Sequence, residues 1–238
     1  MRVRLALLPI AAAAVLLAGC ATTGTPAAVT TTTTPATNGV EALAPADIIT
    51  KAKATLAAAK SFHVKGGATD NGTKADIDLT FQGKNFAGTI STSGITLNVE
   101  VLGPDLYLKA PDAFWQAILA SQPAAASALS SFQGKWVKVS STTAGLSDFT
   151  GIGPDDFLQT NGDLTKGAIK TVNNTPTIPV VNADKSVIYV AVQGQPYPIQ
   201  VSDAAGTSTL DFSQFNTAPD ITAPAAADVF DAKKLLGG

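Results

Sequence analysis

Polar and apolar residues alternate most strictly along residues 74–82. The odd positions in this segment are apolar, namely Ala75, Ile77, Leu79 and Phe81. The even positions are polar, namely Asp76, Asp78, Thr80 and Gln82. A period of two residues predicts a β-strand with one face on an apolar core and the other in water, as in an antiparallel sheet covered on one side.

The same alternation continues on both sides of this strand. Further strands are predicted at residues 62–70, 85–92, 95–101 and 106–109. Short turns such as Asp70-Asn71-Gly72 and Gly103-Pro104-Asp105 separate them. Residues 62–109 are therefore expected to form a meander of about five antiparallel strands.

Helical spacing of apolar residues marks other segments. Residues 45–60 predict an amphipathic helix that begins at Pro45, whose fixed φ suits a first helical turn. Residues 111–132 predict two short helices broken at Gln122-Pro123, and residues 154–158 predict a further helical turn. A short helix is also expected at residues 226–235.

A second β-rich block follows the helices. Strands are predicted near residues 136–139, 168–173, 178–182, 187–193, 197–202 and 207–212. Two meanders with helices before and between them predict an α+β fold, with one large curved antiparallel sheet whose apolar face the helices cover. Such a face encloses either a packed core or a cavity, because both give the same alternation.

The apolar face supplies the candidate ligand-binding residues. If it encloses a cavity, we expect the lining to consist of Ile77, Leu79, Phe81, Phe86, Ile90, Leu97, Val99, Val101, Leu108, Phe114, Trp115 and Ile118. Ordinary core packing is the simpler explanation for any one of these side chains taken alone.

The N-terminus predicts export and anchoring. Arg2 and Arg4 precede an uncharged apolar run at residues 5–17, and small residues lead to Cys20. This order is typical of a secretory signal peptide, here residues 1–19, and the run is too short to span a membrane. The stretch Leu17-Ala18-Gly19-Cys20 also resembles the bacterial lipobox, which implies a lipid on the thiol of Cys20. An ordinary cleavage site beside an unmodified cysteine is the alternative.

The predicted mature chain begins with a tether. Residues 20–44 are rich in threonine, proline and alanine, without hydrophobic periodicity, and Thr30–Thr34 form an unbroken run. Such a composition predicts a disordered segment, either bare or O-glycosylated. Residues 45–238 are then expected to form a single domain.

Charge and composition exclude several classes of function. Loss of Arg2 and Arg4 with the signal peptide would change the formal net charge from −2 to −4. We see no basic face for nucleic acid and no disulfide, since Cys20 is the one cysteine. His63 is the one histidine, so a histidine metal cluster is excluded, and we expect no cofactor.

Candidate catalytic groups are sparse. His63 would have to serve in any Ser/His/Asp arrangement, but no G-x-S-x-G motif is present. The pair Asp155-Asp156 is more simply explained as charge at a helix start, and Asp76 with Asp78 as the solvated face of a strand. We therefore expect a protein that is not an enzyme.

Three stretches carry a family resemblance: LGPDLYLKAPDAFWQAI at 102–118, GKWVKVS at 134–140 and ITAPAAADVFD at 221–231. Together with the lipobox and tether, they resemble actinobacterial, including mycobacterial, lipoproteins of the LppX and LprG type. This resemblance implies a half-open barrel similar to LolA and LolB, with helices over a hydrophobic cavity. It also implies binding and transport of acylated lipids or lipoglycans across the cell envelope.

The expected partners follow from this resemblance. They are the cell membrane, reached on its extracytoplasmic face through the acylated Cys20, a lipid or glycolipid ligand, and an envelope transporter. We expect a monomer. The alternative function is an anchored envelope interaction protein with a solid core and no lipid cargo.

Overall fold

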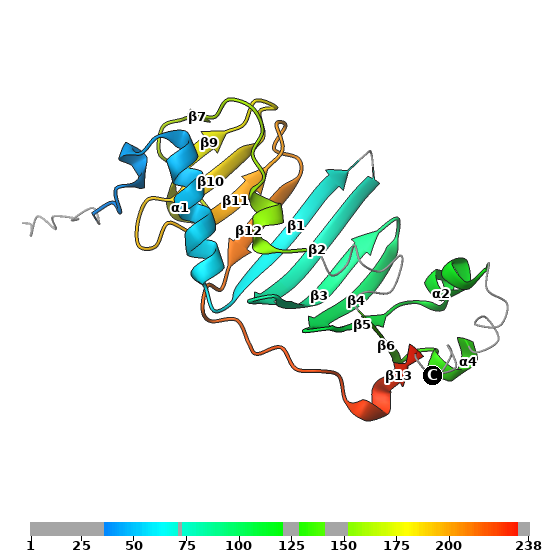
Figure 1. Cartoon of the computed structure of the whole chain (residues 1–238). Helices are drawn as coiled ribbons and strands as arrows, with labels where there is room; N and C mark the ends of the chain where they lie inside the picture. Colours follow the sequence, from blue (N-terminus) through cyan, green and yellow to red (C-terminus); the bar gives the residue numbers. More distant parts are fainter. Residues whose placement is uncertain (1–35, 71–72, 121–128, 141–151, 233–238) are drawn as a thin grey trace, which may run out of the picture. The chain divides into compact units, whose positions relative to one another are not determined.

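One β-sheet contains all the strands of the residues that the computed structural model describes, which are 36–70, 73–120, 129–140 and 152–232 (Figure 1). The strands are β1 (Phe62–Asp70), β2 (Thr73–Gln82), β3 (Asn85–Thr92), β4 (Ile95–Leu102), β5 (Asp105–Lys109), β6 (Trp136–Ser140), β7 (Thr165–Lys166), β8 (Lys170–Val172), β9 (Thr175–Val181), β10 (Val187–Ala191), β11 (Pro198–Ser202), β12 (Thr209–Ser213) and β13 (Val229–Asp231). Their order in the sheet is β13-β6-β5-β4-β3-β2-β1-β12-β11-β10-β9-β7, with β8 paired to β9. The order does not close on itself, so the sheet is open, and the α+β class is confirmed.

The first meander forms as the alternation predicts. β1 to β5 pair in sequence, each antiparallel to the next, and β6 continues the series. The two meanders meet where β1 pairs with β12. Because the register keeps every other residue on one side, the apolar residues of successive strands fall into continuous rows.

The C-terminal residues are the clearest correction. A 3₁₀ turn, η4 (Ala226–Asp228), is followed by β13, where the sequence pattern predicted a helix. β13 runs parallel to β6, so the sheet is mixed and not purely antiparallel. Pairing with this edge satisfies backbone groups in a segment too short to form a stable helix alone, and Phe230 packs against Phe132 with ring centroids 5.3 Å apart.

The helices divide their contacts between the two ends of the sheet order. α1 (Pro45–Ala58) begins at the predicted proline and packs against β9, β10, β11 and the 3₁₀ helix η3 (Pro154–Leu158). At the other end, α2 (Asp112–Leu119) packs on α4 (Leu129–Phe132), which packs on β13 (Figure 1). The helical turn predicted at 154–158 is thus a 3₁₀ helix.

The folded unit begins before the predicted boundary at residue 45. Asn38 donates its backbone N–H to the Val192 oxygen at 2.7 Å and its side-chain amide to the Ala191 and Gly194 oxygens at 3.0 and 3.1 Å. Val40, in the 3₁₀ helix η1 (Val40–Ala42), is fully buried in the core. Contacts between residues so far apart in sequence leave no periodic signal, which is why the predicted boundary at residue 45 is too late: the described fold already includes Asn38 and Val40. The earlier part of the predicted tether, including Cys20, and the predicted signal peptide lie outside the described residues.

Candidate functional site

Three cross-strand rows form the apolar face of β1 to β6. The register places residues opposite one another in the rows Phe62-Phe81-Phe86-Val101-Leu106, Val64-Leu79-Gly88-Val99-Leu108-Val137 and Gly66-Ile77-Ile90-Leu97. Cross-strand neighbours on one face are close enough for their side chains to pack. The predicted face therefore exists as one continuous apolar surface.

Most of the predicted lining residues are buried within a single hydrophobic cluster. The buried ones are Leu79, Phe81, Phe86, Ile90, Leu97, Val99, Val101, Leu108 and Trp115. Ile77 and Phe114 are half-buried and pack against this cluster. The side chain of Ile118 lies outside the described residues. Whether these residues line a cavity stays a prediction.

Glycine interrupts the middle row at Gly88. Its φ is 149°, and a Cβ there would lie 2.0 Å from the backbone oxygen of Asp78 on β2. This is too close for any side chain, so β2 and β3 can approach as they do only because position 88 has none.

Aromatic rings pack against the first row of this face at its β1–β2 end. Phe157 of η3 contacts Phe81 edge-on, with ring centroids 5.5 Å apart and planes at 81°. It contacts Phe212 in the same way, at 5.9 Å and 82°. Phe81 also stacks on Phe62, with centroids 4.9 Å apart and planes at 7°. This end of the apolar face, which we call the Phe81 end, is therefore filled by protein side chains.

A second set of rings lies at the opposite end of the face. We call Phe114, Trp115, Phe132 and Phe230 the aromatic cluster. Trp115 meets Phe114 at 5.3 Å and Phe132 at 5.5 Å, both edge to face. Several side chains on α2, α4, β6 and β13 pack against the core while only half-buried, namely Phe114, Leu119, Leu129, Val139 and Phe230.

The indole nitrogen of Trp115 is buried and unpaired among the described residues. The Trp115 side chain is 6% exposed, and its indole nitrogen Nε1 has no hydrogen-bond partner within the described part of the chain. Buried tryptophan N–H groups ordinarily find an acceptor, and leaving a donor unpaired costs about 1–3 kcal/mol. The sequence pattern placed Trp115 on this face but gave no sign of the unpaired donor, nor of Phe157 and Phe230 as neighbours of the face.

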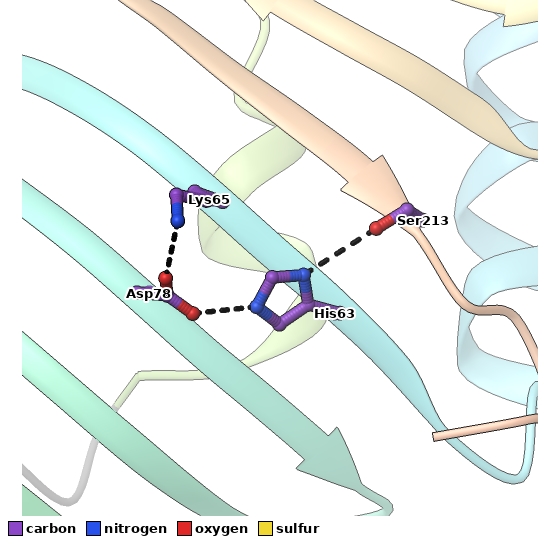
Figure 2. A network of polar contacts seen from close by, with 4 residues as sticks. All are labelled: His63, Lys65, Asp78 and Ser213. Atoms are coloured by element: carbon purple, nitrogen blue, oxygen red, sulfur yellow. Dashed lines mark hydrogen bonds and ion pairs between the residues drawn. The ribbon is translucent and has the colours of Figure 1, made fainter.

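The opposite face of the sheet is polar. His63 and Lys65 on β1 and Asp78 on β2 point to one another there, with Ser213 at the end of β12 (Figure 2). His63 Nε2 lies 2.6 Å from Asp78 Oδ1, and Lys65 Nζ lies 2.7 Å from Asp78 Oδ2. The hydrogen bonds from Lys65 and from His63 lower the pKa of Asp78, and the one to Asp78 raises the pKa of Lys65.

These residues include the three types of a Ser/His/Asp arrangement. His63 Nδ1 lies 3.4 Å from Ser213 Oγ, which is long for a hydrogen bond to a hydroxyl. Asp78 shares its charge with Lys65, which lies directly opposite it in the ladder. Cross-strand contacts to the Asp78 carboxylate account for His63 and Lys65, and Ser213 lies beside His63 at the end of β12. Asp76, two residues from Asp78, pairs with Lys74 at 3.1 Å, as expected for a solvated strand face.

Among the described residues, the other candidate carboxylates form no catalytic or metal-binding group. Asp156 of η3 accepts a hydrogen bond from the Gly153 N–H at 2.7 Å, in line with its predicted place at a helix start. The described residues contain no cluster of three or more metal-ligating side chains. They also contain no helix long and apolar enough to cross a membrane.

Three open grooves line the described surface, of about 570, 220 and 310 Å³. The first lies beside Tyr197 and Phe215, whose rings stack with centroids 3.9 Å apart. Of the predicted lining residues, only Ile77 borders any of these three grooves.

Comparison with known proteins gives similarities of fold. No family model matches the chain, and no curated protein matches it. The structure is similar to the crystal structure of LprF from Mycobacterium bovis, at 12% identity and a TM-score of 0.49, over 76% of this chain and 97% of that one. It is also similar to an uncharacterized conserved protein from Thermus thermophilus, at 10% identity and a TM-score of 0.37, over 78% and 98% of the two chains.

Proposed function

We propose that this chain is a lipoprotein, anchored through an acylated Cys20 on the extracytoplasmic face of the cell membrane, that binds acylated lipids or lipoglycans and carries them across the cell envelope. The bound acyl chains would lie against the apolar face of β3 to β6, between the sheet and helices α2 and α4. The protein would act as a monomer and exchange lipid with a membrane or an envelope transporter.

The observation that carries this proposal is the half-exposed apolar rim around the aromatic cluster. Leu119 and Leu129 on the two helices, and Val139 and Phe230 on the sheet edge, all keep solvent contact beside a fully apolar core. The buried polar side chains of the described residues are Ser61, Thr177, Asn182 and Ser202, and none of them lies on β2 to β6. An acyl chain entering here would meet apolar side chains and one unpaired polar atom, the indole nitrogen of Trp115.

The energetics favour such an occupant. Each methylene removed from water contributes about 0.8 kcal/mol, so a chain of modest length supplies several kcal/mol. The buried residues of the face pack on one another in this structure. Binding therefore requires side chains of this cluster to move apart, and the gain from burying the acyl chain must exceed the cost of that rearrangement.

A solid core is the second candidate, and the packing of the Phe81 end favours it. There, Phe62, Phe81 and Phe157 fill the space between η3 and the sheet. If the whole face is packed in this way, the anchored domain would bind a partner in the envelope through its polar face. In neither case do we propose enzymatic activity, because a cross-strand ion pair accounts for His63 and Asp78.

Lipid extraction tests the two candidates. The chain from residue 20 onward, with Cys20→Ala so that no acyl group is attached, is purified, extracted with organic solvent and examined by mass spectrometry. We expect co-purifying acyl lipid and saturable uptake of a fluorescent fatty-acyl probe. Absence of both would support the solid core.

Two matched variants locate the site. Leu119→Lys places a charge on the half-buried rim and should reduce probe uptake at least about fivefold, since an ammonium group is costly to bury beside an acyl chain. Ile169→Lys makes the same change at a side chain that is 48% exposed and outside the rim, and should leave uptake unchanged. Equal uptake by both variants would place the lipid elsewhere.

A further inference from the structure

The unpaired indole N–H of Trp115 is the feature of the apolar face that packing alone does not explain. The side chain is 6% exposed, within edge-to-face contact of Phe114 and Phe132, and Nε1 has no partner in the described part of the chain. An indole N–H can only donate. A phenylalanine would fill a similar apolar site without an unpaired donor. A tryptophan at this position is therefore better explained if its N–H binds an acceptor.

The other unpaired buried atoms have simpler explanations. They are one carboxylate oxygen each of Glu41 and Glu100. The second oxygen of Glu41 accepts a hydrogen bond from Thr37. Glu100 lies between Val99 and Val101 on β4 and therefore points to the other side of the sheet from the apolar face; burial raises the pKa of its carboxyl. The indole of Trp115 has one polar atom and no second protonation state, and none of the described residues pairs it, so a bound ligand can supply the acceptor.

We propose that the Trp115 N–H donates a hydrogen bond to the ester carbonyl of a bound acyl lipid. This inference rests on the lipid-binding function proposed above and narrows the ligand class. An ester carbonyl is neutral and accepts without donating, so it pairs the indole and leaves no new group unpaired. A carboxylate would bring a charge into an uncharged aromatic cluster, and a sugar hydroxyl would bring a donor of its own.

The position of Trp115 suits this role. An ester carbonyl marks the head of an acyl chain, and Trp115 lies where α2 and α4 meet the half-exposed rim. With its carbonyl at Trp115, the hydrocarbon would extend into the hydrophobic cluster to which Trp115, Val99 and Leu108 all belong. The head group would stay near solvent.

The chain supplies a matched control because its two tryptophans are Trp115 and Trp136. Trp115→Phe removes the N–H and keeps a ring, and Trp136→Phe makes the same change on β6. Each variant, in the chain from residue 20 onward with Cys20→Ala, is titrated with a dipalmitoyl glycerol diester and with the corresponding diether, which lacks carbonyls. Displacement of the fluorescent fatty-acyl probe gives the Kd values.

We expect Trp115→Phe to weaken diester binding about tenfold, which corresponds to about 1.4 kcal/mol, and to leave diether binding within about twofold. Trp136→Phe should change neither Kd. In the Trp136→Phe protein, where Trp115 is the only tryptophan, diester binding should shift the emission to longer wavelength. The thermal midpoint of lipid-free Trp115→Phe should not fall, because the lost donor was unpaired.

Each other outcome has a separate meaning. Equal weakening of diester and diether would show that Trp115 contributes shape only, which overturns the hydrogen bond but leaves lipid binding intact. If the protein with both tryptophans bound neither lipid, the proposed function itself would fail.

Discussion

Replacing Phe81 by alanine tests whether the Phe81 end of the apolar face is solid protein. Phe81 is 1% exposed and contacts three rings, those of Phe62 at 4.9 Å, Phe86 at 5.4 Å and Phe157 at 5.5 Å. A buried Phe→Ala change costs about 3–5 kcal/mol, and the loss of three aromatic contacts places this one in the upper part of that range. The free energy of unfolding of a domain is about 5–15 kcal/mol, so about a quarter or more would be lost.

Urea denaturation of the lipid-free protein, followed by circular dichroism, measures this loss. We expect a lower midpoint with an unchanged slope and, for a domain of this size, a fall in Tm of about 2–4 °C for each kcal/mol lost. Ile169→Ala is the control, since this side chain is 48% exposed and should change stability by less than about 0.5 kcal/mol.

A loss below about 1 kcal/mol for Phe81→Ala would refute the reasoning, since burial of a whole phenylalanine side chain accounts for more than that. Phe81 would then border space that protein atoms do not fill, and the lipid site would have to extend to β1 and η3.

The remaining predictions concern a glycine, an ion pair and the anchor. Gly88→Ala should destabilise the fold by several kcal/mol, because the new Cβ would lie 2.0 Å from the backbone oxygen of Asp78. Gly94→Ala, at a position with open space and a φ of 78°, should cost only about 1–2 kcal/mol. Equal losses of stability in thermal melts would contradict this reasoning. The pKa of Asp78 is lowered in the folded state, so its contribution to the free energy of unfolding is complete above about pH 4 and is lost as the pH falls further. Because the carboxyl is 42% exposed, this loss is at most about 1 kcal/mol. Asp78→Asn should therefore flatten the acid part of a plot of stability against pH. An equally steep profile in the variant would assign the acid sensitivity to other groups. Cys20→Ala should abolish incorporation of an alkyne-tagged palmitate while Thr23→Ala retains it, as seen on a gel, and labelled Cys20→Ala would place the acyl group on another residue.

The strands could be predicted because alternation is a local signal. Leu79 and Val99 are on the core side in the structure, as the sequence pattern indicated, and Lys65 and Asp78 are on the polar side. Segments held by distant contacts could not be predicted in this way. Phe230 lies in a strand that forms only against the edge of β6, and Asn38 is fixed by backbone oxygens more than 150 residues away. No local period records either contact.

The candidate site was likewise predictable only in the features that leave a local pattern in the sequence. Alternation predicts the apolar face that contains Phe81, and helical spacing adds Trp115 to it. Neither pattern separates the roles of the two residues, because a packed core and a ligand-lined cavity need the same residues at the same spacing. The difference between them depends on what each side chain meets. Phe81 meets three rings and has no polar atom to satisfy, whereas Trp115 meets two rings and keeps an unpaired donor beside a half-exposed rim. If lipid binds to this domain, it should therefore bind at the Trp115 end, and the Phe81 end should supply the stability that allows the packing around Trp115 to rearrange.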